Sequence, residues 1–389
     1  MFSSRLRQAA GRNRLAVAVE RRRAAGLEIL DLTLSNPTRA GFAYPRDLLA
    51  PMADARGLCY EPEPFGLLSA REAVSHHLER HAATVAPERI VLTASTSEAY
   101  SLLLKLLCDP GDTVLAPRPS YPLIEYLTDL EGVSLEHYRL EFHGRWEIDV
   151  DGLREKAGSG RMRAIIMISP NNPTGSSVTD RELDAVASIA HQHDLAIISD
   201  EVFSDYRIDG DAPRSALRQS DALTFALGGL SKSVGLPQVK LGWIAVGGGT
   251  PEVSAALDRL ETICDAYLSV STPVQVAAPE LLVAGASVRA QIQNRVRGNY
   301  DALIAAVAAI PSCTVMPVEA GWYAIVQVPA LASEDTIVVD LLNETGVLVH
   351  PGYFFDFERE AFLVVSLLPD PRVFAAAVEA LLRQIGRLR

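Results

Sequence analysis

Lys232 is the residue of this chain best placed for covalent chemistry. It lies in the stretch GGLSKSVGLPQVKLGW, residues 228–243, on a turn of small residues between two apolar segments that we expect to be strands. Burial beside such strands disfavours the ammonium form, lowers the pKa of the amine and frees it to condense with a carbonyl group. The glycines let another group approach the backbone closely. A solvated loop lysine is the alternative interpretation of this stretch taken alone.

Other polar and aromatic residues follow apolar segments in the same way. They are Thr96, Ser97, Tyr121, Asn172 and Asp200. Thr96 and Ser97 stand where a strand turns into a helix, and the free N–H groups and dipole of a helix start favour a phosphate. Many capped helices bind nothing, so this feature does not define a site by itself. Because several such groups coincide with strand ends, we expect them to share one site.

The segments that must position these residues alternate between strands and helices from about residue 89 to residue 246. The predicted strands are apolar throughout and cover residues 89–93, 113–116, 163–169, 195–199 and 222–227. Apolar strands separated by helices are typical of a mostly parallel sheet covered by helices on both faces. Ligands of such sheets bind at the carboxyl ends of the strands, where Asp200 and Lys232 fall. The sequence therefore predicts an α/β fold with a site at that edge.

The remainder of the chain predicts a second, smaller domain of α+β character. A length of 389 residues suggests two domains. We place the large domain at residues 45–270 and the small domain at residues 1–44 and 271–389. The first 23 residues are rich in arginine and could imitate a transit peptide. We favour an amphipathic helix on the surface or across a subunit contact, because the helical pattern continues to Gly26.

The composition of the chain indicates which classes of binding partner and which cellular compartment to expect. A net charge of −12 argues against nucleic acid or an anionic membrane as a partner, and no apolar run is long enough to span a membrane. The four cysteines are widely spaced without a CxxC pair, which indicates neither a zinc site nor a disulfide framework and favours the reducing cytoplasm. The adjacent His76 and His77 point to different sides of a predicted helix. We interpret them as surface or packing residues and expect no metal.

Three motifs resemble those of a known family when they are taken together. They are NNPTG at 171–175, ISDEVF at 198–203 and LSK at 230–232, and they resemble the class I/II aminotransferases, the fold-type I pyridoxal-phosphate enzymes. The resemblance covers nearly the whole chain. It implies a large pyridoxal-phosphate-binding domain beside a smaller one. It also implies a transaminase that moves an amino group from an amino acid to a 2-oxo acid through an aldimine of Lys232 with pyridoxal 5'-phosphate.

The resemblance implies a role for each matching residue. Lys232 becomes the base that moves the substrate proton, and Asp200 pairs with the pyridine nitrogen of the cofactor and keeps it protonated. Asn172 hydrogen-bonds the phenolic oxygen, and Tyr121 stacks on the ring. The residues implied to hold the phosphate are Thr96, Ser97, Ser231 and Lys240. Tyr60 resembles a tyrosine that reaches the phosphate of the neighbouring subunit, which implies a homodimer with shared sites.

Four positions depart from the family pattern. Lys240 stands where an arginine is usual and offers a point charge without the bidentate fork. Phe203 stands where a tyrosine usually donates to the phenolic oxygen, and Gly229 replaces a frequent serine. Val364, in FLVVSLL, occupies the position of the arginine that holds the substrate α-carboxylate. Arg39 is our candidate to replace it, with a solvated loop arginine as the alternative.

These departures leave other activities open. A lyase or cyclase of the same fold would use the same lysine. A transaminase for an amine without the usual α-carboxylate contact would explain Val364. A binding protein with a relict site is disfavoured, because Lys232, Asp200 and Asn172 are all present. The aromatic run at residues 353–357 is interpreted as packing of the small domain, with an apolar substrate wall as the alternative.

Overall fold

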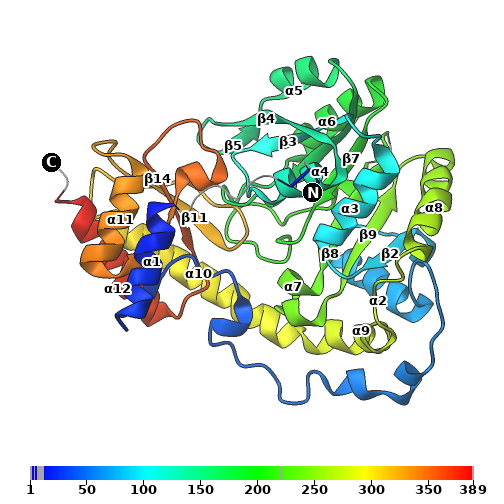
Figure 1. The fold of residues 1–389 in the computed structure, drawn as a ribbon, viewed down its shortest axis with the longest axis horizontal. Helices are drawn as coiled ribbons and strands as arrows, with labels where there is room; N and C mark the ends of the chain where they lie inside the picture. The colour runs from blue at the N-terminus through cyan, green and yellow to red at the C-terminus, as the bar shows by residue number, and fades with distance from the viewer. Residues whose placement is uncertain (1, 4, 7–12, 220, 388–389) are drawn as a thin grey trace.

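A computed structural model describes residues 2–3, 5–6, 13–219 and 221–387 of the chain. Its centre is an eight-stranded sheet in the order β2-β9-β8-β7-β6-β3-β4-β5 (Figure 1). The strands are β2 (Ile90–Thr93), β3 (Thr113–Arg118), β4 (Ser134–Phe142), β5 (Trp146–Ile148), β6 (Met162–Ile168), β7 (Ala196–Asp200), β8 (Thr224–Gly229) and β9 (Gly242–Gly247). Every residue of β2, β8 and β9 is buried, as expected of apolar strands covered on both faces.

Most strands of this sheet run in one direction. β3, β6, β7 and β8 are parallel neighbours, and β4 is parallel to β3. β9 is antiparallel to both β8 and β2, so β2 runs the same way as β8. β5 is antiparallel to β4. The carboxyl ends of β2, β3, β6, β7 and β8 therefore meet at one edge, and the amino end of β9 lies at that same edge.

Helices cover both faces of the sheet (Figure 1). One face packs against α3 (Thr96–Leu107), α4 (Leu123–Glu131) and α8 (Thr250–Asp265), whose apolar side chains join those of the strands in one buried cluster. The other face packs against α5 (Val150–Ala157) and α6 (Asp180–Gln192) in a second cluster. α6 begins at a capping box formed by Thr179 and Glu182.

Three further helices extend the structure beyond the sheet. α9 (Thr272–Ala284) packs on α2 (Leu68–Leu78), and α10 (Ala286–Val307) continues from α9 toward the second sheet (Figure 1). The two helices meet at Gly285, where a Cβ atom would lie 2.5 Å from the Cβ of Val234. The absence of a side chain at this junction lets it pack directly on the segment that follows Lys232.

The second sheet is small and antiparallel. It contains β10 (Thr314–Val315), β11 (Tyr323–Gln327), β14 (Phe362–Ser366) and β13 (His350–Pro351). β1 (Leu30–Asp31) pairs in parallel with β12 (Val347–Leu348), so the N-terminal residues join the C-terminal part of the chain. α1 (Arg14–Ala24) packs on α11 (Glu334–Thr345), and α12 (Pro371–Ile385) packs on α10.

The predicted fold class is confirmed, because a mostly parallel α/β sheet stands beside a smaller α+β unit. The domain boundaries at residues 44/45 and 270/271 stay a prediction. The predicted N-terminal helix corresponds to α1, whereas Arg7 and Arg12 of the basic stretch lie outside the described residues. None of the helices in the described ranges is long and apolar enough to cross a membrane.

Candidate active site

The residues predicted from strand ends lie along one edge of the main sheet. Across the sheet their order is Thr96 and Ser97 (β2), Lys240 (β9), Lys232 (β8), Asp200 (β7), Asn172 (β6) and Tyr121 (β3). All of these strands except β9 end at this edge, and β9 begins there. The topology therefore brings an amine, a carboxylate, an amide, an aromatic ring and a helix start to one side of the molecule.

Lys232 lies in α7 (Leu230–Ser233), a single helical turn that follows β8 directly. Its Nζ atom is 5.0 Å from the ring centre of Trp322 and 5.8 Å from that of Phe203, within cation–π range. Burial lowers the pKa of this amine to about 8, and the nearby charge of Asp200 opposes the shift. An appreciable fraction of the amine is therefore unprotonated near neutral pH, as a nucleophile or base requires.

Asp200 is the last residue of β7. Its Oδ1 accepts a hydrogen bond from the Val202 N–H at 3.2 Å, and its Oδ2 accepts one from the Tyr100 hydroxyl at 3.1 Å. Burial raises the pKa of Asp200 to about 6, while the two hydrogen bonds and the charge of Lys232 oppose the rise. At neutral pH the carboxylate is mostly ionised, so it can sustain a proton on a nitrogen that faces it.

The start of α3 forms a cradle for an anion. Ser95 caps the helix and accepts a hydrogen bond from the third helical N–H, so the N–H groups of Thr96 and Ser97 have no acceptor within the helix. Gly242 lets this turn approach β9 closely, because a Cβ there would lie 3.1 Å from the carbonyl carbon of Ser95. Lys240, two residues earlier, is exposed. A helix start beside a lysine is a combination that favours a phosphate.

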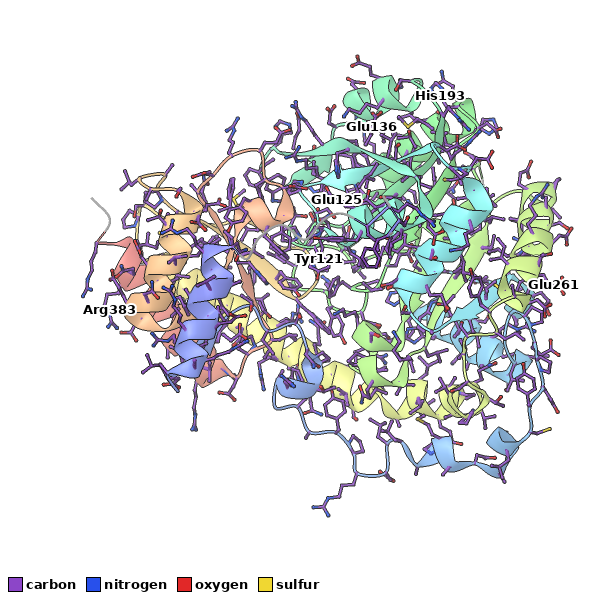
Figure 2. The ribbon with its side chains drawn as sticks, in the orientation of Figure 1. Tyr121, Glu125, Glu136, His193, Glu261 and Arg383 are labelled. Carbon is purple, nitrogen blue, oxygen red and sulfur yellow. The ribbon has the colours of Figure 1, made fainter. Side chains whose placement is uncertain are left out.

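Tyr121 stands between the two sheets (Figure 2). Its ring lies 6.1 Å from that of Phe354 and 6.3 Å from that of Phe355. Phe355 is buried, as the packing interpretation of this aromatic run expects, whereas Phe354 is 37% exposed beside Tyr121. The run therefore packs within the small domain and also borders the site.

Asn172 carries a buried side-chain oxygen for which the described residues provide no hydrogen-bond partner. Its neighbour Asn171 is committed to the loop, where its Oδ1 accepts a hydrogen bond from the Thr174 hydroxyl at 3.1 Å. An unpaired buried amide lowers the stability of the folded chain. A polar ligand atom at this edge would satisfy it.

The departures from the family pattern have structural counterparts. Phe203 packs its ring edge against Trp322 at 5.3 Å and places no hydroxyl at the site. Val364 is fully buried in β14, opposite Ile325 and His350 on the neighbouring strands. Because β14 has the sequence FLVVS, it presents no cation to a substrate. At Gly229 a Cβ would lie 3.0 Å from the carbonyl oxygen of Leu241, so a serine there would need a small shift of the β8–β9 backbone.

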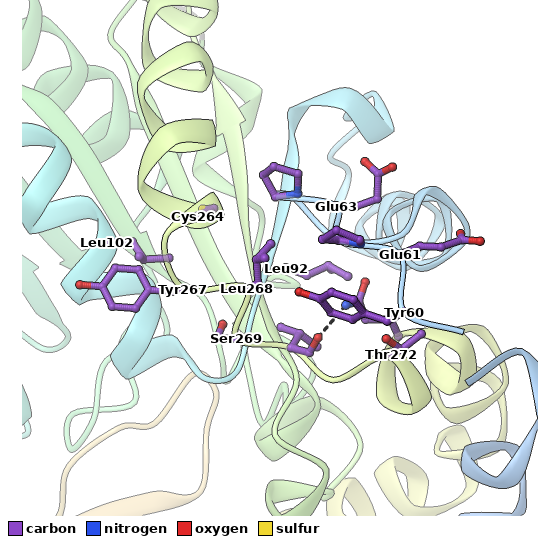
Figure 3. A pocket seen from close by; sticks show the side chains of 15 residues that line it. Tyr60, Glu61, Glu63, Leu92, Leu102, Cys264, Tyr267, Leu268, Ser269 and Thr272 are labelled. Atoms are coloured by element: carbon purple, nitrogen blue, oxygen red, sulfur yellow. Dashed lines mark hydrogen bonds between the residues drawn. The ribbon is translucent and has the colours of Figure 1, made fainter. Parts of the chain in front are cut away.

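Two predicted residues, Arg39 and Tyr60, are separate from the strand-end residues described above. No hydrogen bond, ion pair or ring contact joins them to the residues above in the part of the chain that the structure describes. Arg39 ends a short turn (Pro37–Arg39) and is exposed. Tyr60 is 71% exposed and lines a small surface pocket with Tyr267 and Thr272 (Figure 3).

Sequence reasoning missed three residues that shape the site. Tyr100 reaches Asp200 from the apolar run of α3, and Trp322 reaches Lys232 from the chain before β11. Tyr206 binds the backbone of the lysine turn, where its hydroxyl donates to the Lys232 carbonyl. These contacts span between 26 and 100 residues of sequence. No local spacing rule indicates them.

A buried polar cluster lies behind the lysine turn. His77 and His81 are one helical turn apart, and their Nε2 atoms lie 3.8 and 3.6 Å from the carboxylate oxygens of Asp205. A metal ion could bridge atoms at such spacing. However, guanidinium nitrogens of Arg80 and Arg289 already lie 2.9 and 3.7 Å from Asp205 Oδ1 and balance its charge. We interpret the cluster as an ion-pair network, with His77 as a packing residue.

The amino-acid sequence matches the aminotransferase class I and II family over residues 43–381. The chain belongs to this family. The glutamate-pyruvate aminotransferase AlaA of Haemophilus influenzae is 27% identical over 378 residues, which cover 94% of this chain and 92% of that protein. An alanine aminotransferase of Mycobacterium tuberculosis is 28% identical over 372 residues, covering 92% of this chain and 86% of the relative.

Solved structures agree on the fold of this aminotransferase. An aminotransferase from Escherichia coli has a TM-score of 0.87 and 24% identity, and the match covers 100% of this chain and 98% of that one. The alanine aminotransferase of Pyrococcus furiosus has a TM-score of 0.87 and 23% identity over 95% of each chain. At this identity the likeness shows the fold alone.

The family uses pyridoxal 5'-phosphate, and the residues at the strand-end edge fit this group. The amide N–H groups of Asn172 and the free N–H groups at the start of α3 can donate hydrogen bonds to its oxygens. The amine of Lys232 and the carboxylate of Asp200 match its aldehyde and its ring nitrogen in chemical character. The protein is therefore a transaminase whose edge residues suit the family's cofactor.

Proposed function

We propose that Lys232 is the lysine that holds pyridoxal 5'-phosphate, and that the enzyme passes an amino group from an amino acid to a 2-oxo acid. The observation that carries the proposal is an amine whose pKa is lowered by desolvation beside a carboxylate whose pKa is raised by desolvation, at neighbouring strand ends. The chain has only three other lysines. Of these, Lys105 forms an ion pair with Glu131, and Lys156 donates to a backbone carbonyl.

Each edge residue then has one task. When bound, pyridoxal 5'-phosphate supplies an electron sink for the charge left on the substrate Cα. Lys232 is the base that takes the proton from that Cα. Asp200 keeps a proton on the ring nitrogen, Asn172 donates an amide N–H to the phenolic oxygen, and Tyr121 stacks on the ring. The proposed phosphate ligands are Thr96, Ser97, Ser231 and Lys240.

Arg39 is proposed to bind the substrate carboxylate. The loop that leads to it runs beside β14, because Ser366 donates hydrogen bonds to the carbonyls of Leu32 and Leu34 at 2.7 and 2.6 Å. β14 itself supplies no cation, since Val364 is apolar and buried. The Arg39 guanidinium has no ion pair with any described residue, so it is free to take a carboxylate.

We also propose a homodimer in which Tyr60 reaches the phosphate of the neighbouring subunit. Support comes from exposed apolar side chains near this loop: Leu58 is 90% exposed, Tyr60 71% and Tyr267 55%. Burying them against a second copy would remove apolar surface from water. A cytoplasmic location is proposed as well, and the four free cysteines support a reducing compartment.

Val364 favours a second candidate, a transaminase whose amine substrate lacks an α-carboxylate. In that case the apolar surface of β14 would need no cation, and Arg39 would be an ordinary solvated residue. A lyase or cyclase would use Lys232 and Asp200 in the same way, so the products must distinguish these reactions.

A half-reaction tests the proposal. Cofactor-loaded protein is mixed with single amino acids, first alanine and glutamate, without a 2-oxo acid acceptor. We expect one equivalent of 2-oxo acid per site and then no further product until an acceptor is added. Continuous release of ammonia would contradict transamination and indicate a lyase. Reaction only with amines that lack the carboxylate would support the second candidate. Lys105→Ala should behave as wild type, whereas Lys232→Ala should lose turnover by several orders of magnitude.

A further inference from the structure

Tyr100 links the two ends of the proposed cofactor site from a single helix. It lies in α3 four residues after Thr96, one helical turn along the same face. Thr96 belongs to the helix start that we assign to the phosphate, whereas the Tyr100 hydroxyl lies 3.1 Å from Asp200 Oδ2. The side chain is 2% exposed, so the packing of α3 on the sheet fixes its position.

The Asp200 carboxylate has few other partners. The Val202 N–H donates to Oδ1, and Lys232 is the charged group that faces the carboxylate. Among the described residues, Tyr100 is the only side chain that donates a hydrogen bond to it. Tyr138, the other buried tyrosine close to Tyr100, donates its hydroxyl to the backbone carbonyl of Ile166 at 2.9 Å and does not compete.

We propose that Tyr100 is a positioning residue whose hydroxyl keeps the Asp200 carboxylate ionised and orients it toward the protonated ring nitrogen of pyridoxal 5'-phosphate. This inference rests on the proposed function. A phenol hydroxyl that donates to a carboxylate stabilises the charged form without adding a charge of its own. Burial acts in the opposite direction and raises the pKa of Asp200. The tyrosine thus offsets part of the effect of burial.

Loss of the Tyr100 hydroxyl changes the protonation of Asp200 in a predictable direction. Without its donor, the pKa of Asp200 rises further, and the ionised carboxylate persists only at higher pH. A hydrogen bond to a charged group corresponds to roughly a tenfold change in an equilibrium constant. Cofactor affinity should therefore fall only about twofold near pH 7 but about tenfold near pH 5, because its decline toward acid should begin about one pH unit higher.

The test measures the dissociation constant of pyridoxal 5'-phosphate for Tyr100→Phe over a range of pH. A second probe is the 1-deaza analogue, in which carbon replaces the ring nitrogen. Tyr138→Phe is the matched control, because it also removes one buried tyrosine hydroxyl that donates a single hydrogen bond, but not to Asp200. We expect Tyr100→Phe to weaken the natural cofactor about tenfold near pH 5 and about twofold near pH 7, and to leave the analogue unchanged at both. Tyr138→Phe should change neither.

Equal weakening of both probes by Tyr100→Phe would overturn the inference, because it would indicate a purely structural role. Unchanged affinity for both probes would also overturn it. In an Asp200→Asn background, Tyr100→Phe should not lower cofactor affinity further. An additional loss of affinity would contradict the proposal that Tyr100 acts through the Asp200 carboxylate. If Tyr100→Phe does not fold, Tyr100→3-fluorotyrosine is the second variant, because fluorine makes the hydroxyl a stronger donor. It should move the acid-side loss of cofactor affinity to lower pH. A shift of that loss to higher pH would contradict the proposal. Failure of the wild type to bind the natural cofactor would overturn the proposed function itself.

Discussion

The hydroxyl of Tyr206 lies 2.5 Å from the backbone carbonyl oxygen of Lys232 and donates a hydrogen bond to it. The same hydroxyl lies 3.1 Å from the carbonyl oxygen of Ser233. Within the turn, the Gly235 N–H donates to the Lys232 carbonyl at a long 3.3 Å, and Tyr206 adds a shorter bond from outside the helix. Its neighbour Asp205 is held in turn by Arg80. The loop after β7 therefore fixes the backbone at Lys232, while β7 itself carries Asp200.

Tyr206→Phe should loosen the lysine turn. The lost hydroxyl leaves two backbone carbonyls without this donor, so we expect a fall of about 1–2 kcal/mol in the free energy of unfolding. Because Lys232 would be less well placed, kcat should fall more than KM rises. Urea denaturation and steady-state kinetics measure both effects. Tyr138→Phe is the control, because it loses one hydrogen bond to the Ile166 carbonyl and none to the lysine turn. An equal loss of kcat in the two variants would argue against this positioning role.

Asp200→Asn should change how the stability of the cofactor-free protein depends on pH. Burial raises the pKa of Asp200 from 3.8 to about 6. A carboxyl group of raised pKa contributes stability below its unfolded pKa, and this stability is lost as pH rises through the folded value. Relative to wild type, the variant should therefore gain about 2 kcal/mol between roughly pH 4 and pH 7, with little further change above. Unfolding in urea across this range measures the difference. A difference that does not vary with pH would refute the buried-carboxylate description.

Arg39→Ala should weaken binding of the amino-acid substrate. Loss of a guanidinium–carboxylate contact predicts roughly a tenfold rise in KM, with a smaller change in kcat. Arg46→Ala is the matched control, because Arg46 is exposed in the same segment. Initial rates over a range of amino-acid concentrations distinguish the two. If KM stays the same in Arg39→Ala, the carboxylate is bound elsewhere. That result would also favour the second candidate, a transaminase whose amine substrate lacks an α-carboxylate.

The strand-end logic of parallel sheets made part of this site predictable. Asp200, Asn172 and Lys232 each follow a short apolar run, and β6, β7 and β8 prove to be parallel neighbours. Chain topology then places their carboxyl ends together without any knowledge of side-chain packing. The helix start at Thr96 was predictable for the same reason, because Ser95 is a good cap and β2 precedes it.

Other parts were beyond sequence reasoning for physical reasons. β4, with the sequence SLEHYRLEF, was not predicted as a strand, because it is largely solvent-accessible and its charged residues hide the pattern. Tyr100 looks like one more core residue of an amphipathic helix, and only the fold reveals that its hydroxyl ends at Asp200. Trp322 and Tyr206 likewise contact Lys232 although they are distant from it in the sequence. Tertiary packing, rather than local pattern, decides such contacts.

Trapping the cofactor on its lysine tests the central claim most directly. Protein loaded with pyridoxal 5'-phosphate is reduced with borohydride, digested and mapped by mass spectrometry. The chain offers four lysines: Lys105, Lys156, Lys232 and Lys240. We predict a single pyridoxyl group on Lys232, because only this amine combines a pKa lowered by desolvation with a neighbouring carboxylate. A label on another lysine, or no stable label in protein that still transaminates, would contradict the account.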